Sequence, residues 1–338
     1  MKRWFFTALS FVVVIGASVY AVRSGASEGF TLRLPLQAHV LAFLAFAVEI
    51  VARAFKLTWS AKAVRTRLPF MTAVRTSLGG DFGASITPAR MGAEPARYLI
   101  LAEAGIPATD AMVILYTEIF FEAISMAIVV AGIAVLFHAS ARARIAMAGV
   151  IGLYALFVTG VTVIGVLMAR RAHDDEPPWA RRLRLHGERW ERVKQWFSRA
   201  RITVDAFKSM RPGWGTLSLL ASVVHIAVRF TVLPAIIYSS TTASVPVAPL
   251  VVWPLGIIYG AGVVPAPGGG GAVELTFHAA LGSAIPANLF APALVWWRFY
   301  TFYIYIIIGG LVAGNTALRA VREAEDVEEE LEREIVEG

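Results

Sequence analysis

Charged side chains interrupt several long apolar stretches of this sequence. Glu118 and Glu122 lie four residues apart in one stretch, so a helix would place both carboxylates on the same face. Arg229 and Arg298 lie in two later stretches. An ionisable side chain at the centre of a bilayer costs about 2.5–3.5 kcal/mol on insertion scales. We therefore expect these charges to pair with one another or to line a wet cavity.

Two segments rich in glycine and proline, 68–108 and 247–287, carry further charges. Each contains a proline, a glycine four residues later and a glutamate six or seven residues later. Matching helix breaks in the two halves of a membrane protein point to a transporter's binding site. The residues expected to shape the breaks are Gly80, Asp81, Pro88, Gly92, Pro267, Gly268, Gly269 and Gly270. The alternative is a pair of unrelated surface loops.

These residue types favour an anionic ligand. Helix N-termini offer free N–H groups, glycine lets the backbone approach closely, and arginine binds phosphate through two parallel hydrogen bonds. The expected substrate-binding residues are Arg90, Glu94, Arg97, Glu118, Glu122, Arg229, Glu274 and Arg298. The ligand would be a lipid phosphate or another anionic headgroup. Structural ion pairs between helices are the competing interpretation.

The composition indicates a membrane protein. The 338 residues are 57% hydrophobic and only 16% charged, with a mean hydropathy of +0.64. Soluble domains are about 45–50% apolar and about 25% charged. The composition therefore excludes soluble globular, disordered and fibrous proteins. The net charge of +7 lies mainly beside apolar runs, so no nucleic-acid partner is expected.

No cofactor, metal site or catalytic residue is expected. The chain has no cysteine, which excludes disulfides, thiolate zinc sites and iron–sulfur clusters. The glycine run at 268–271 is not a nucleotide-binding P-loop, because no Lys-Ser or Lys-Thr follows it.

The expected fold is an all-α polytopic membrane protein with two oppositely oriented re-entrant helical hairpins, which form an inverted repeat. Six apolar stretches are long enough to span a bilayer, at about 4–22, 36–55, 111–137, 145–169, 214–238 and 289–314. The first could instead be a cleaved signal peptide. The transmembrane domain would cover 1–322, and residues 323–338 would form an acidic cytoplasmic tail.

Basic loops set the expected orientation. Lys and Arg concentrate in a loop at 56–75 and in a long loop at 170–212, and such loops stay in the cytoplasm. Both termini would then be cytoplasmic, and the segments 68–108 and 247–287 would enter from opposite sides. An amphipathic helix at about 180–207 would lie on the anionic leaflet, or pack on the cytoplasmic end of the bundle.

Local motifs resemble those of one family. Gly80-Asp81-Phe82, followed by Thr87-Pro88-Ala89-Arg90-Met91-Gly92-Ala93-Glu94-Pro95-Ala96-Arg97, resembles the signature of the lysylphosphatidylglycerol synthase transmembrane family, which is also described as flippase-like. Glu118 resembles the family's acidic position, whereas Glu122 stands where an aspartate is expected. Pro265 to Glu274 and Arg298 with Thr301 resemble two further motifs, although Gly271 lengthens the glycine run. The resemblance covers about 5–315.

This resemblance implies a lipid translocase with a site between the two hairpins. Large members of the family add a soluble aminoacyl-transferase domain, and since this sequence ends at Gly338 without one, we do not expect lipid aminoacylation. We expect alternating access for a membrane lipid, in the cytoplasmic membrane of a prokaryote, with a homo-oligomer possible. The alternatives are an intramembrane lipid-modifying transferase and a non-transporting partner that recruits a cytoplasmic enzyme.

Overall fold

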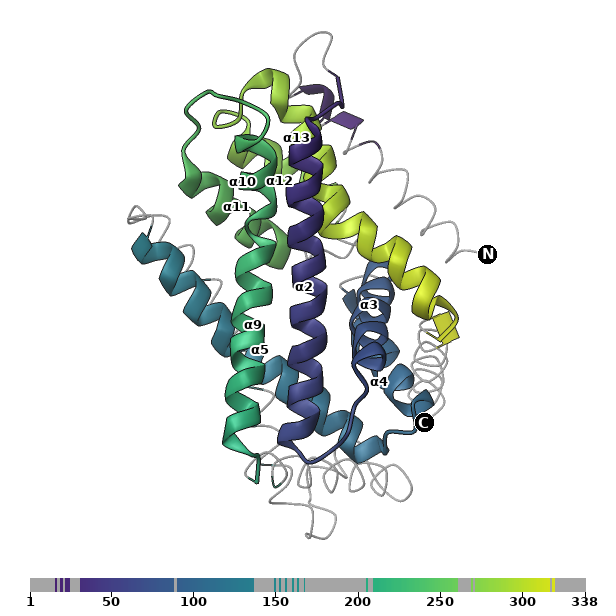
Figure 1. Cartoon of the computed structure of the whole chain (residues 1–338). Helices are drawn as coiled ribbons and strands as arrows, with labels where there is room; N and C mark the ends of the chain where they lie inside the picture. The colour runs from purple at the N-terminus through teal and green to yellow at the C-terminus, as the bar shows by residue number, and fades with distance from the viewer. Residues whose placement is uncertain are drawn as a thin grey trace, which may run out of the picture.

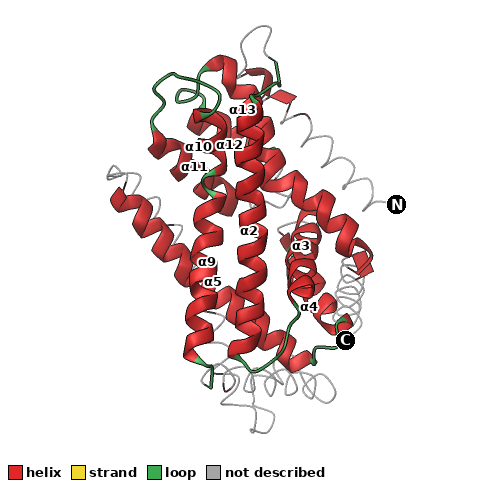
Figure 2. Ribbon diagram, viewed as in Figure 1, coloured by secondary structure: helices red, strands yellow, loops and turns green. Residues whose placement is uncertain are grey.

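The computed structural model describes residues 31–87, 90–136, 209–260 and 271–316 as continuous segments, with isolated residues elsewhere. Within these segments all regular secondary structure is helical (Figure 2). The all-α prediction is therefore confirmed for this part of the chain. Several predictions concern residues outside it, namely most of 4–22 and 145–169, most of the loop 170–212, the tail 323–338, and Pro88, Pro267, Gly268 and Gly270.

Three long apolar helical stretches match predicted spans. They are Ala108–Leu136, Pro212–Tyr238 and Ala287–Thr316, and each is long and apolar enough to cross a membrane. The first is α5 (Ala108–Leu136). The second consists of α9 (Pro212–Arg229) and α10 (Val232–Tyr238), and the third begins with α13 (Ala287–Arg298) and the π-helix η4 (Phe299–Tyr303).

Helix α2 (Leu36–Ala63) lies at the centre of the molecule beside α9 (Figure 1). It was predicted to end near residue 55, with a cytoplasmic loop beginning at Lys56. That boundary is wrong, because the helix continues for about two more turns and Lys56 is completely buried. Lys56 has carboxylate partners within the bundle, so its charge does not force the chain out of the helix.

The first broken segment forms a hairpin of α3 (Phe70–Ile86) and α4 (Ala93–Glu103). Glycines allow its two arms to touch at the tip, since a Cβ on Gly83 would lie 2.5 Å from the carbonyl oxygen of Gly92. Thr87 fixes the turn, because its hydroxyl donates to Gly83 and accepts from the amide of Gly92, both at 2.8 Å. The arms are only about 25 Å and about 16 Å long, at 1.5 Å per residue.

The second broken segment places α11 (Val247–Gly260) against α12 (Ala272–Leu281). Glu274 was predicted to open the second half-helix, and it does so as the third residue of α12. Its carboxylate accepts a 2.8 Å hydrogen bond from the amide of Gly271, which caps the helix. Gly271 adopts φ +78°, a conformation open to glycine but strained for other residues.

Two hydrophobic clusters fix the hairpins against opposite halves of α2. Phe46 in the N-terminal half packs in one cluster with Phe277 of α12. Leu57 in the C-terminal half packs in another with Leu101 of α4. The hairpins accordingly lie toward opposite ends of the central helix (Figure 1).

Both later spans are irregular next to an arginine. Helix α9 ends at Arg229, and Pro234 follows five residues later in α10. Proline has no backbone N–H to donate, and its ring clashes with the carbonyl of the residue four positions earlier, so a continuous helix is interrupted here. The π-helix η4 begins directly after Arg298. Such π segments are often found at functional sites, and this one places Thr301 and Phe302 beside a pocket.

Candidate functional site

The central helix α2 carries three buried charges on one face. Glu49, Arg53 and Lys56 follow one another at spacings of four and three residues, and each is at most 4% exposed. The sequence analysis assigned none of them to the site. The signal that could have found them was their helical spacing, with Glu49 and Arg53 inside a predicted span and Lys56 directly after it.

Lys56 joins the two acidic residues predicted to share a face of the third span. Its Nζ atom lies 2.9 Å from Oε1 of Glu118 and 3.0 Å from Oε2 of Glu122. Arg97 of α4 lies 3.3 Å from the other oxygen of Glu118 and 3.2 Å from Glu94. The structure thus gathers four predicted residues into one ionic network, namely Glu94, Arg97, Glu118 and Glu122. Lys56, which the sequence analysis did not assign to the site, is a further cation of this network, called the α5 network below.

A second group of charges lies nearer the hairpin tip. Arg53 donates to both carboxylate oxygens of Asp81 on α3, one of them at 3.3 Å. Arg90 approaches the same carboxylate at 3.9 Å. Arg229 lies 3.4 Å from Oε1 of Glu49. This group contains three arginines and two carboxylates.

Tyr305 completes the pairing of Glu49, since its hydroxyl donates to Oε2 of that residue. Arg229 also donates to the carbonyl of Thr301 at 3.1 Å. These bonds attach the end of α9 both to α2 and to the last span. They satisfy charges that would be costly to bury unpaired.

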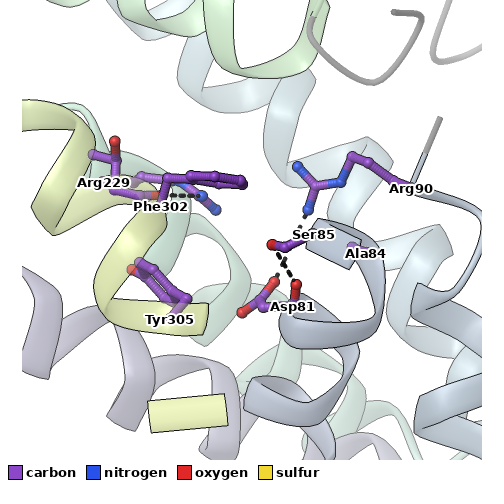
Figure 3. Close-up of a pocket in the computed structure, with 8 residues that line it drawn as sticks. Asp81, Ala84, Ser85, Arg90, Arg229, Phe302 and Tyr305 are labelled. Atoms are coloured by element: carbon purple, nitrogen blue, oxygen red, sulfur yellow. Dashed lines mark hydrogen bonds and ion pairs between the residues drawn. The ribbon is translucent and has the colours of Figure 1, made fainter. Parts of the chain in front are cut away.

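A pocket opens among these residues (Figure 3). It contains about 290 Å³ of empty space, including the part that opens to its surroundings, and it is lined by Asp81, Ala84, Ser85, Arg90, Arg229, Thr301, Phe302 and Tyr305. Arg90 and Arg229 point into it from opposite sides, and Asp81 lies between them at its floor. The pocket therefore presents two guanidinium groups to a small ligand.

The backbone at the hairpin tip directs Arg90 toward this pocket. Arg90 has φ +62°, an unusual value for a residue with a side chain. Its side chain is 39% exposed, compared with 5% for Arg53 and 14% for Arg229. Arg90 is thus the most accessible cation of the pocket group.

Glu274 and Arg298, both predicted to bind substrate, pair with each other instead of lining this pocket. Nε of Arg298 donates to Oε1 of Glu274 at 2.8 Å, and both side chains are less than 10% exposed. The guanidinium also lies 4.3 Å from the ring centroid of Phe302, which does line the pocket. Glu274 of α12 is thereby linked to the pocket wall through Arg298, which contacts the pocket residue Phe302.

The glycines predicted to shape the breaks serve as spacers where they are described. A Cβ on Gly80 would lie 2.5 Å from Nε of Arg97, and one on Gly92 would lie 2.7 Å from the carbonyl oxygen of Gly83. Gly269 adopts φ +65°. Glycine at these positions permits close contact of the arms and of the arginine that enters the α5 network.

The site is suited to electrostatic binding of an anion. Among the described residues there is no group of three or more histidine, aspartate or glutamate side chains that could hold a metal ion. Guanidinium groups around a small pocket match the planar, bidentate geometry of phosphate or carboxylate oxygens. The carboxylates near the pocket are themselves held in ion pairs.

The described part of the chain is all-helical and has three helical stretches long and apolar enough to cross a membrane, as in a multi-pass membrane protein. A comparison with family models places it more closely. The model described as "lysylphosphatidylglycerol synthase TM region" matches residues 5–309, so the chain belongs to this family. The resemblance inferred from the hairpin motifs is therefore confirmed. A comparison with curated proteins gives no match.

Proposed function

We propose that this protein is a lipid translocase that moves a phosphate-bearing or otherwise anionic lipid across the cytoplasmic membrane. The observation that carries the proposal is the pocket in which Arg90 and Arg229 face each other among buried charges. The headgroup would bind between these arginines. The acyl or prenyl chains would remain in the surrounding lipid, so no full-width pore is needed.

The order of elements supports alternating access. In the described segments, a long helical stretch, a short hairpin and another long helical stretch occur twice, first as α2, α3–α4 and α5, then as α9–α10, α11–α12 and the span Ala287–Thr316 that begins with α13. In our proposal the two hairpins enter the membrane from opposite sides as an inverted repeat. Such repeats in transporters place the substrate near the midplane and expose it to each side in turn.

Substrate binding would change the contacts of Arg90. Among the described residues its one ion-pair contact is the 3.9 Å approach to Asp81, which Arg53 already holds at both oxygens. Arg90 can therefore turn to a headgroup without leaving a buried carboxylate unpaired. Because Arg90 lies at the hairpin tip, the bound headgroup would connect the α3–α4 hairpin to Arg229 on α9.

The pairing of the carboxylates favours transport over lipid chemistry. An intramembrane transferase would need an available general acid or base. Glu118 is held between Lys56 and Arg97, and Glu49 between Arg229 and Tyr305. We therefore propose a transporter and not an enzyme, with a lipid as its principal partner.

Reconstitution into liposomes tests this function. Lipids would carry a fluorescent label on an acyl chain, and a reductant that cannot cross the membrane would be added outside the liposomes. The reductant destroys labels in the outer leaflet, so loss of fluorescence from the inner leaflet would report transfer. We expect wild-type protein and Arg67→Ala, an exposed control in the loop after α2, to transfer anionic lipid, and Arg90→Ala to lose at least tenfold in rate. Correctly folded Arg90→Ala that transfers lipid at the wild-type rate would contradict the proposed site.

A further inference from the structure

The charges around the pocket are not balanced. Arg53, Arg90 and Arg229 face only two carboxylates, Asp81 and Glu49, within the pairs described above. The pocket group therefore has an excess of one positive charge. Arg53 and Arg229 are the closely paired and well-buried cations, so the excess lies on Arg90.

The α5 network carries the opposite excess charge, and its Glu122 interacts electrostatically with Arg90. That network has three glutamates against Lys56 and Arg97, and its most exposed acid is Glu94, at 46%. Neither Glu94 nor Glu122 lines the pocket. A small headgroup held between Arg90 and Arg229 therefore meets the positive excess directly.

Among the described residues, the pocket group offers no unpaired carboxylate for an ammonium group. Arg53 binds both oxygens of Asp81, and the two oxygens of Glu49 are bound to Arg229 and Tyr305. An ammonium ion placed here would meet Asp81, whose two oxygens Arg53 already binds, and the guanidinium groups of Arg90 and Arg229. Headgroups with an amine are therefore disfavoured by repulsion and by unmet hydrogen bonding.

The pocket hydroxyls are already committed as donors. Ser85 donates to the carbonyl of Asp81 and Thr301 donates to the carbonyl of Trp297, both at 2.7 Å. The hydroxyl of Tyr305 donates to Glu49. Among the described side chains that line the pocket, the donors left for a ligand are thus guanidinium N–H groups, of which each arginine has five. Such a donor set selects oxygens that carry negative charge.

From these contacts we infer that the pocket selects a phosphodiester lipid with one negative charge and no ammonium group in its head. One phosphodiester charge cancels the single excess charge of the pocket group. This inference rests on the proposed function only in taking the ligand to be a lipid. It adds a rule for selection, in which Arg90 sets the preferred headgroup charge.

Binding and transfer should be measured on the full chain with three lipids that have identical acyl chains. Phosphatidylglycerol has one negative charge and no amine, phosphatidylserine has the same net charge but includes an amine, and phosphatidylethanolamine is zwitterionic. We expect phosphatidylglycerol to bind at least tenfold more tightly than either of the others. Native mass spectrometry would report binding, and the liposome assay would report transfer.

Variants of Arg90 test the rule itself. Arg90→Gln removes the excess charge and should lower phosphatidylglycerol affinity about tenfold while leaving phosphatidylethanolamine affinity unchanged. Arg90→Lys retains the charge and should preserve the order of preference, although it loses the bidentate geometry. Arg67→Gln makes the same chemical change at an exposed position outside the pocket and should behave as wild type.

The outcomes separate this inference from the proposed function. Transfer of all three lipids at similar rates, unaffected by Arg90→Gln, would overturn the selection rule and leave translocation intact. Tight, Arg90-dependent binding of phosphatidylglycerol without transfer of any lipid would support the selection rule and refute translocation. Preferential binding of phosphatidylserine or phosphatidylethanolamine by wild-type protein would also overturn the rule.

Discussion

Replacing Lys56 with methionine tests whether the α5 network holds the bundle together. Lys56 is fully buried and lies within 3.0 Å of two carboxylates, Glu118 and Glu122. Methionine keeps much of the side-chain volume but removes the charge. Glu118 would then retain only Arg97, and Glu122 would lose its close cation.

Removing one partner of a buried ion pair costs about 3–5 kcal/mol. We place Lys56→Met at the lower end, near about 3 kcal/mol, because the Glu122 side chain is 23% exposed and water screens part of its charge. At about 2 °C per kcal/mol for a chain of this size, the melting temperature should fall by roughly 6 °C.

The assay is thermal unfolding in a mild detergent at a fixed scan rate, with a matched lysine as control. Lys62 lies on the same helix, is exposed, and contacts the ring of Trp214 at 4.6 Å. Lys62→Met should therefore cost no more than about 1 kcal/mol. The double variant Lys56→Met/Glu122→Gln restores the network charge and should recover part of the loss. A Lys56→Met protein as stable as wild type would refute this account, as would a double variant less stable than the single one.

Two further substitutions test local features of the site. Gly83→Ala would force a Cβ against the carbonyl of Gly92 and should destabilise the hairpin by about 1–3 kcal/mol, whereas Gly132→Ala in open space within α5 should be neutral or stabilising; equal melting temperatures for the two variants would contradict the close contact. Tyr305→Phe removes the donor to a buried oxygen of Glu49 and should cost about 1–3 kcal/mol in the same assay, while a melting temperature unchanged from wild type would show that this bond contributes nothing.

Sequence reasoning located three spans and the two helix breaks of the described segments because apolar length and glycine–proline breaks are local signals. Glu118 and Glu122 were placed on one face from spacing alone, and both contact Lys56. The family motifs also identified Asp81 and Arg90, which line the pocket. Local patterns therefore sufficed for the elements and for part of the site.

The ion-pair partners of these charged residues could not be predicted from local sequence patterns. Arg229 was expected to pair with another charge or to line a wet cavity, and it does both: it lines the pocket and pairs with Glu49, a residue that the sequence analysis did not assign to the site. Such pairings depend on how distant helices pack, which spacing along one helix does not specify. Lys56 was assigned to a loop because a run of basic residues follows it, and only the three-dimensional arrangement reveals two carboxylates beside it.

The mixed charges along α2, one negative followed by two positive, limit how this helix can slide. The helix forms ion pairs with three neighbouring helices, through Glu49 to α9, through Arg53 to α3 and through Lys56 to α5. Sliding α2 by one turn, about 5.4 Å, would bring Glu49 toward the level of Asp81 and oppose two negative charges. These ion pairs therefore oppose axial sliding of α2 relative to α9, α3 and α5.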